Sequence, residues 1–213
     1  HFTIPLPQDK GTGLGKPLKI INHLVKEDIP IAIASLGPKS VETTAEIADA
    51  WLPAFYTPEA ADAVWGESLK AGKKLRDPNR AVLDIFAGGA VGIGAGMEPH
   101  REKGRAGAAL YIGGMGARSK NFYNDIFSKS GYAEEAKLIQ DLYLSGKKDA
   151  AAAAIPDDYL AKSSLIGEEA FVTDRINALK ESGVTTLNVS FIGSDPSERI
   201  HQCERLKNLV EKL

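Results

Sequence analysis

Short apolar runs alternate with segments of mixed polarity along this chain, a pattern typical of an α/β protein. Four apolar runs predict buried strands, and the segments that follow them carry apolar residues at helical spacing. Because strands that alternate with helices usually pair in parallel, the sequence predicts a parallel sheet. The predicted strands span residues 31–35, 50–55, 81–87 and 186–191.

A long helical segment separates the third and fourth predicted strands. A glycine-dense loop is expected first, with glycines at 88, 89, 92, 94 and 96. Helices are then predicted over 98–112, 121–129, 133–145 and 147–154, with Asn121 as an N-cap. We interpret residues 98–165 as a helical insertion within a single domain of residues 1–213, and insertions of this size often form lids.

Composition excludes several classes of function. The net charge of −2, with dispersed lysines and arginines, argues against a nucleic-acid partner. The longest apolar runs are too short for a membrane span. The four histidines lack metal-ligand spacing, so no metal site is predicted. A single cysteine, Cys203, indicates a reducing, cytoplasmic location and is expected to face the core of the last helix.

The junction after the first strand can bind a phosphate. Gly37 allows a close backbone approach, and Pro38 fits the first turn of a helix, where a missing N–H has no cost. The N–H groups of Lys39, Ser40 and Val41 would then point back over the strand end, at the positive end of the helix dipole. The same junction also occurs as an ordinary turn between strand and helix, so both interpretations stay open.

Several motifs in order resemble the luciferase-like monooxygenase superfamily, and most closely its branch that uses the deazaflavin coenzyme F420. They are HFTIPLP, GTGLGKPLKII, IPIAIASLGPKSVETTAEIADAWLPAFYTPE, YIGGMGARSKNFYND and IQDLYLSGK, and they cover nearly the whole chain. The resemblance implies a (β/α)8 TIM barrel of the bacterial luciferase type, with its site at the C-terminal strand ends. The four predicted strands would be strands 5–8, so the chain would be the C-terminal part of the barrel.

The resemblance also implies where the cofactor binds. Its phosphate would lie against the backbone of Ser35, Leu36, Gly37 and Pro38, with Ala54 and Phe55 opposite. Alanine at position 54 replaces a hydroxyl residue found in some relatives, so no side-chain contact is expected there. Arg118 and Lys120 could meet the acidic tail of the coenzyme, or could lie on a solvated helix junction. Catalytic residues would belong to the absent strands and cannot be named.

The implied reaction is hydride transfer between C5 of reduced coenzyme F420 and an organic small-molecule substrate. An alternative within the family is an FMN-dependent monooxygenase that activates oxygen. A different class stays open as well: a half barrel could be a non-catalytic flavin-binding or partner-binding protein. Because a half barrel exposes its edge strands, we expect a homodimer or pairing with the missing N-terminal half. An unrelated phosphate-binding α/β domain is the remaining possibility.

Overall fold

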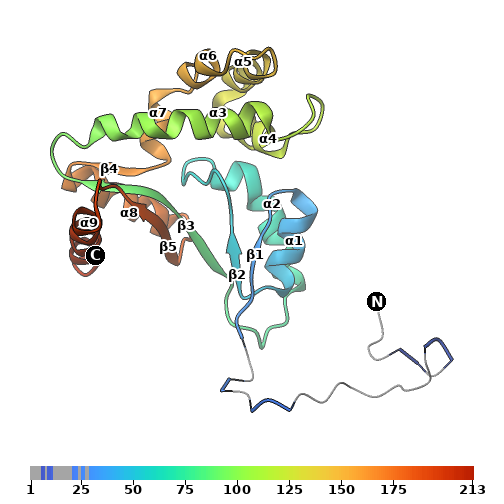
Figure 1. The fold of residues 1–213 in the computed structure, drawn as a ribbon. Coiled ribbons are helices and arrows are strands. Elements are labelled where there is room, and N and C mark those ends of the chain that lie inside the picture. Colours follow the sequence, from blue (N-terminus) through green and yellow to red (C-terminus); the bar gives the residue numbers. More distant parts are fainter. Residues whose placement is uncertain (1–5, 8, 12–20, 24, 27–28) are drawn as a thin grey trace.

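The described residues of the computed structural model are 6–7, 9–11, 21–23, 25–26 and 29–213. Within them, five strands pair in parallel as one sheet (Figure 1), which confirms the predicted α/β class. The fourth strand, β4, was not expected from the sequence. The strands are β1 (Ala32–Ala34), β2 (Ala50–Leu52), β3 (Asp84–Ile93), β4 (Leu165–Gly167) and β5 (Thr186–Phe191).

Strand β3 organises the sheet because every strand except β1 pairs with it. β2 pairs with its first two residues, Asp84 and Ile85, and β5 pairs with Phe86–Val91. β4 pairs with its last three residues, Val91–Ile93. Since Val91 pairs with both β4 and β5, these two strands lie on opposite edges of β3. β1 pairs only with β2, at the end of the sheet.

The loop predicted after the third strand is wrong in its first part. Gly88, Gly89 and Gly92 lie within β3, which continues to Ile93. A side chain at Gly89 would place its Cβ 2.5 Å from the carbonyl oxygen of Ser163. These glycines therefore mark a close approach of backbones in the sheet rather than a turn.

Helices cover one face of the sheet, and along β5 the opposite face is exposed. Along β5, the odd-numbered residues from Leu187 to Phe191 pack against the main core, whereas Thr186, Asn188 and Ser190 are exposed. This alternation is the one expected of a strand with one covered face. The helices on the covered face are α1 (Pro38–Ile47), α2 (Glu67–Leu75), which continues from the π-helix η1 (Asp62–Gly66), α8 (Glu169–Glu181) and α9 (Pro196–Val210).

The helices that follow β3 and precede β4 in the sequence pack around a second hydrophobic core. Ile112, Phe127, Ile139 and Tyr159 are among its buried residues, and Phe55 packs against both cores. Figure 1 shows this helical unit above the sheet. It consists of η2 (Glu98–Lys103), α3 (Gly104–Gly114), α4 (Phe122–Phe127), η3 (Ser128–Tyr132), α5 (Ala133–Leu144), α6 (Lys148–Ala153) and α7 (Asp157–Lys162).

The last helix differs from its prediction. Cys203 is exposed, so the expectation that it faces the core is wrong. The buried face of α9 instead carries Gln202, Leu206 and Leu209. The amide oxygen of Gln202 accepts a hydrogen bond of 2.7 Å from the N–H of Ile93, which explains how a polar residue occupies a core position.

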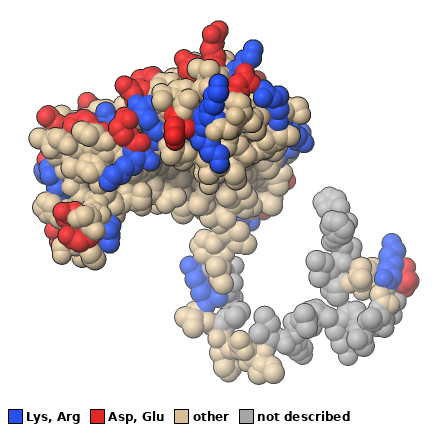
Figure 2. All heavy atoms as spheres, turned by 45° about the horizontal axis from the view of Figure 1, so that its top comes forward, with Lys and Arg blue, Asp and Glu red and all other residues tan. Residues whose placement is uncertain are grey.

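The surface carries charges of both signs. On the face shown in Figure 2, lysines and arginines lie among aspartates and glutamates without forming an uninterrupted basic surface. No helix in the described ranges is both long and apolar enough to cross a membrane. Among the same residues, no cluster of three or more potential metal ligands occurs.

Candidate functional site

The turn between β1 and α1 has the geometry of an anion site. Pro38 begins α1, and Gly37 is an extended N-cap residue without a capping side chain. Among the described residues, the N–H groups of Lys39 and Ser40 have no acceptor. The N–H of Val41 donates to the Gly37 carbonyl at 2.9 Å, so its prediction as a free donor is wrong. Two unpaired donors therefore lie at the positive end of α1.

Two buried tryptophans hold this turn in place. The indole N–H of Trp51 donates to the Ser35 carbonyl at 3.0 Å, and that of Trp65 donates to the Leu36 carbonyl at 3.3 Å. The two rings pack edge to face with centroids 5.3 Å apart. The Ser35 hydroxyl is also hydrogen-bonded to that of Thr44 at 2.8 Å. These contacts orient the carbonyls inward, so the N–H groups of the turn are preorganised.

The chain after β2 brings Ala54 and Phe55 next to the helical unit. Both residues are half-buried, and Phe55 has a positive φ of 58°, a conformation uncommon outside glycine. The Phe55 ring lies 5.9 Å from that of Tyr111 and 5.6 Å from that of Tyr123, centroid to centroid. It also stacks on the Tyr159 ring, with centroids 6.3 Å apart. Aromatic packing thus joins the end of β2 to α3, α4 and α7.

The helical unit also reaches the Gly37 turn. An added Cβ at Gly37 would lie 3.2 Å from Cε1 of Phe122, the first residue of α4. Phe122 is 46% exposed, so an aromatic surface borders the unpaired N–H groups of α1. Asn121 caps α4 as predicted, because its side chain accepts from the N–H groups of Tyr123 and Asn124.

Arg118 and Lys120 lie in the loop between α3 and α4. Arg118 forms an ion pair with Asp141 of α5 and stays 62% exposed. The N–H of Lys120 donates to the Ala117 carbonyl at 2.9 Å, which closes a tight turn. The geometry keeps both cations at the surface near α4, and their role toward a cofactor stays a prediction.

Asp49 fixes the start of the first two strands. One carboxylate oxygen accepts from the N–H of Ile31 at 2.8 Å, and the other accepts from Arg80 at 3.0 Å. The hydrogen bond from Ile31 lowers the pKa of Asp49, with Arg80 contributing. This carboxylate lies at the opposite end of β1 and β2 from Gly37, so its role is structural.

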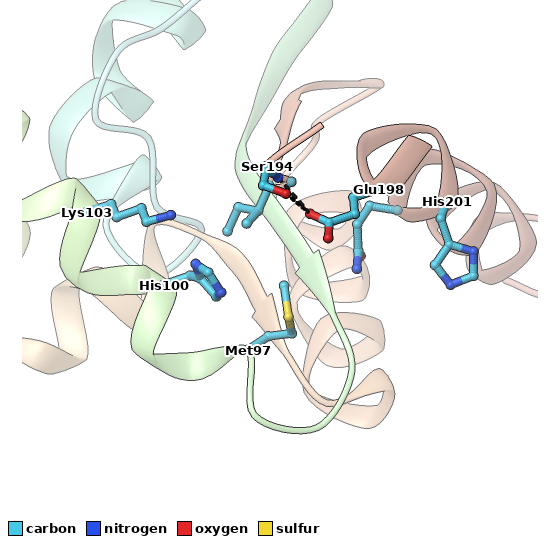
Figure 3. A pocket seen from close by; sticks show the side chains of 9 residues that line it. Met97, His100, Lys103, Ser194, Glu198 and His201 are labelled. Atoms are coloured by element: carbon cyan, nitrogen blue, oxygen red, sulfur yellow. Dashed lines mark hydrogen bonds between the residues drawn. The ribbon is translucent and has the colours of Figure 1, made fainter. Parts of the chain in front are cut away.

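A cavity that the sequence did not predict lies at the carboxyl ends of β3 and β5. Its volume is about 510 Å³, and none of the eight predicted site residues lines it. Figure 3 shows its two walls: Met97, His100 and Lys103 come from the start of the helical unit, and Ser194, Glu198 and His201 come from the segment that enters α9. The two walls are about 100 residues apart in sequence, so no local motif could reveal the cavity.

Hydrogen bonds order one wall of this cavity. The Glu198 carboxylate accepts from the N–H of Ser194 at 2.7 Å and from its hydroxyl at 3.0 Å. The Asp195 side chain accepts from the N–H of Glu198, which caps α9. Asp195 thus caps α9, and Glu198 folds back onto Ser194, the residue before the cap.

Comparison with known proteins identifies the family. The model of the luciferase-like monooxygenase family matches residues 2–186, most of the chain. The chain belongs to this family. The resemblance noted from the motifs is therefore confirmed.

Two curated relatives of this luciferase-like chain cover most of it. It is 34% identical over 199 residues to a Mycobacterium tuberculosis protein provisionally named a coenzyme F420-dependent oxidoreductase, matching 89% of this chain and 55% of that protein. It is 26% identical over 191 residues to the 5,10-methylenetetrahydromethanopterin reductase of Archaeoglobus fulgidus, matching 87% of this chain and 54% of that enzyme. The chain thus spans about half the length of these relatives.

Solved structures share the fold of this luciferase-like chain. The coenzyme F420-dependent tetrahydromethanopterin reductase of Methanopyrus kandleri superposes with a TM-score of 0.58 at 21% identity, over 81% of this chain and 47% of that one. An F420-dependent secondary alcohol dehydrogenase in complex with an F420–acetone adduct also gives 0.58, at 13% identity, over 86% and 49% of the two chains. At these identities the likeness establishes the fold alone.

Proposed function

We propose that this protein is a luciferase-like oxidoreductase that transfers a hydride between coenzyme F420 and an organic substrate. The observation that carries the proposal is the turn at Gly37, at the carboxyl end of a parallel strand, where two backbone N–H groups have no acceptor within the described part of the chain. The names of the Mycobacterium and Archaeoglobus relatives support the choice of cofactor and reaction. Since the chain spans about half of each relative, the activity is proposed for the whole protein that contains it.

We further propose that the sheet forms the second half of a (β/α)8 barrel. β1, β2, β3 and β5 would be barrel strands 5–8, and β4 would extend the sheet where the helical unit returns. The open face of β5 carries the small polar side chains Thr186, Asn188 and Ser190, which suits a barrel interior. The free edges of β1 and β5 would pair with the first half of the barrel.

The residues at the Gly37 turn fit the phosphate of such a cofactor. The N–H groups of Lys39 and Ser40 would donate to the phosphate oxygens, and Gly37 leaves room for the close approach. Ser35, Leu36 and Pro38 form the fixed frame, with Ala54 and Phe55 facing them. Arg118 and Lys120 would attract the acidic tail at the rim of the site.

The protein's part in the reaction is to position the cofactor and to enclose it. Reduced coenzyme F420 supplies the hydride when it is bound. The ring of Phe122 borders the turn, the rings of Tyr111 and Tyr123 pack on Phe55, and these rings would exclude water from one side of the cofactor. The tryptophan hydrogen bonds hold the phosphate donors at fixed positions, which lowers the entropic cost of binding.

Substitution at Gly37 tests this function. An aspartate there would cap α1 with its own carboxylate, taking the N–H groups and repelling a phosphate. We expect Gly37→Asp to weaken binding of oxidised F420 at least tenfold in a fluorescence titration of the full-length protein, with the protein still folded by circular dichroism. Gly37→Ala is the matched control for the contact with Phe122, and it should lose less affinity for F420 than Gly37→Asp.

The same titration separates the alternatives. FMN as a competitor should not displace F420. Displacement by FMN at lower concentration would instead indicate an FMN-dependent monooxygenase. If neither cofactor binds, the oxidoreductase proposal fails, and a non-catalytic role becomes the better explanation. Equal binding by wild type and Gly37→Asp would refute the phosphate site at this turn.

A further inference from the structure

The cavity between η2 and α9 has the chemistry of an anion-binding pocket. In Figure 3 the amine of Lys103 and the ring of His100 point into the space between the two walls, and His201 lies on the far wall. The acid that lines it, Glu198, accepts two hydrogen bonds from Ser194 through one oxygen. The groups that could bind an anion are therefore the Lys103 amine and the hydrogen-bonding rings of His100 and His201.

Two more arginines add positive charge around this cavity. Arg199 donates to the carbonyl of Gly193, a lining residue, at 3.1 Å. Arg101 lies on the neighbouring wall, where it donates to the Ile166 carbonyl and stacks on the Phe171 ring with Cζ 4.5 Å from its centroid. Of the described residues that line the cavity, Lys103 carries a permanent positive charge and Glu198 a carboxylate, whereas Arg199 and Arg101 lie outside its lining. Because α9 is already capped, side chains rather than the helix end create this potential.

A second cavity continues from the first. Its volume is about 320 Å³, and His100, Lys103 and Ile192 line both spaces. The rest of its lining includes apolar residues such as Ala90 of β3 and Leu160 of α7, together with Arg101, Ser163 and Ser164. Lys103 thus lies where the two cavities meet, and apolar side chains line part of the second one.

We propose that the cavity between η2 and α9 binds the anionic group, a carboxylate or a phosphate, of a small molecule whose apolar part extends into the adjoining cavity. The location at the carboxyl ends of β3 and β5 makes this molecule the substrate of the oxidoreductase, and that assignment rests on the proposed function. The anion site itself rests on the lining residues alone.

Histidine NMR signals allow a direct test in the full-length protein. His100 and His201 would be assigned through His100→Gln and His201→Gln, with His23 as an internal reference. Acetate and hexanoate serve as probes, because they share a carboxylate and differ in apolar length. We expect both cavity signals to shift along one saturation curve, and hexanoate to bind at least tenfold tighter than acetate, since each buried methylene contributes about fourfold.

A charge-removing variant adds the matched control. Lys103→Met should weaken hexanoate binding about fivefold, the scale of one partly exposed charge. Lys137→Met removes an exposed lysine on α5 that forms no ion pair within the described residues, and it should leave the affinity unchanged. Equal affinities for the two variants, or cavity signals that do not move, would overturn the proposal.

Coenzyme F420 distinguishes the two sources of the anion. If oxidised F420 shifts the His100 and His201 signals and displaces hexanoate, the pocket receives the cofactor tail, and the substrate assignment is wrong. If F420 binds without moving these signals, the assignment is supported. If F420 does not bind at all while hexanoate does, the proposed function fails, yet the anion site stands.

Discussion

A glycine-to-alanine pair tests how α1, and with it the phosphate turn, is held in place. Gly72 of α2 packs directly on α1: an added Cβ would lie 2.0 Å from the Glu42 carbonyl oxygen and 2.7 Å from the Ala45 Cβ. Ordinary contact begins at 3.4 Å, so the helices would have to separate by about 1.4 Å, the difference between 3.4 and 2.0 Å. The neighbours are backbone and a core methyl group, which cannot rotate away.

Two opposing contributions decide whether this substitution raises or lowers the free energy of unfolding. Alanine gains about 1 kcal/mol over glycine in a helix interior. Overpacking a tight contact costs about 1–3 kcal/mol, and more when backbone must move. Because the neighbours are close and cannot move, we take the overpacking cost at the upper end of this range. We therefore expect Gly72→Ala to destabilise the protein by about 2 kcal/mol and to weaken F420 binding through displacement of α1.

Gly107 of α3 is the matched control, because an added Cβ there meets nothing within 4 Å. Gly107→Ala should stabilise the protein by about 0.5–1 kcal/mol through helix propensity alone. Urea unfolding at constant m-value measures both changes. If Gly72→Ala is as stable as Gly107→Ala, the close packing of α1 on α2 is not what positions the turn.

Two further predictions concern the helical unit. Asn121→Ala should cost about 3 kcal/mol in urea unfolding, because it removes the cap of α4 and two buried hydrogen bonds of 3.0 Å to the carbonyls of Tyr111 and Ile112; the exposed Asn208→Ala should cost nothing, and equal losses would contradict this role. Burial raises the pKa of Tyr159, so its contribution to stability is complete below the unfolded pKa of about 10 and is lost as pH rises above it. Tyr159→Phe should reduce the alkaline loss by about 1.4 kcal/mol per pH unit, and an unchanged pH profile would contradict the assignment.

The sequence predicted the elements whose signal is local. The strand at 186–191 and the helix cap at Asn121 follow from an apolar run and a capping residue, and the structure has them at those positions. β4 was missed because three residues between two helices carry no periodicity. The extension of β3 was missed because its glycines are required by the close approach of the backbone at Ser163 and Asn188, which lie far along the chain.

The candidate site divides in the same way. The Gly37 turn could be predicted because one strand and the helix after it build it entirely. The tryptophans that fix it could not, because their indoles reach it from β2 and η1, 16 and 29 residues away from their acceptors. The cavity between η2 and α9 could not be predicted either. Buried Gln202 breaks the apolar pattern of α9, and the two walls of the cavity meet only in the folded chain.

The helical unit gives the two proposed binding sites a common scaffold. η2 brings His100 and Lys103 to the cavity, and α3 continues from η2 toward the loop that leads to Phe122 at the Gly37 turn. α3 has 11 residues and so spans about 16 Å, a distance that a packed helix holds constant. A cofactor anchored at the turn and a substrate anchored in the cavity would meet between these ends, below α3. The length of one helix would then set how far the anionic group of the substrate lies from the phosphate of the cofactor.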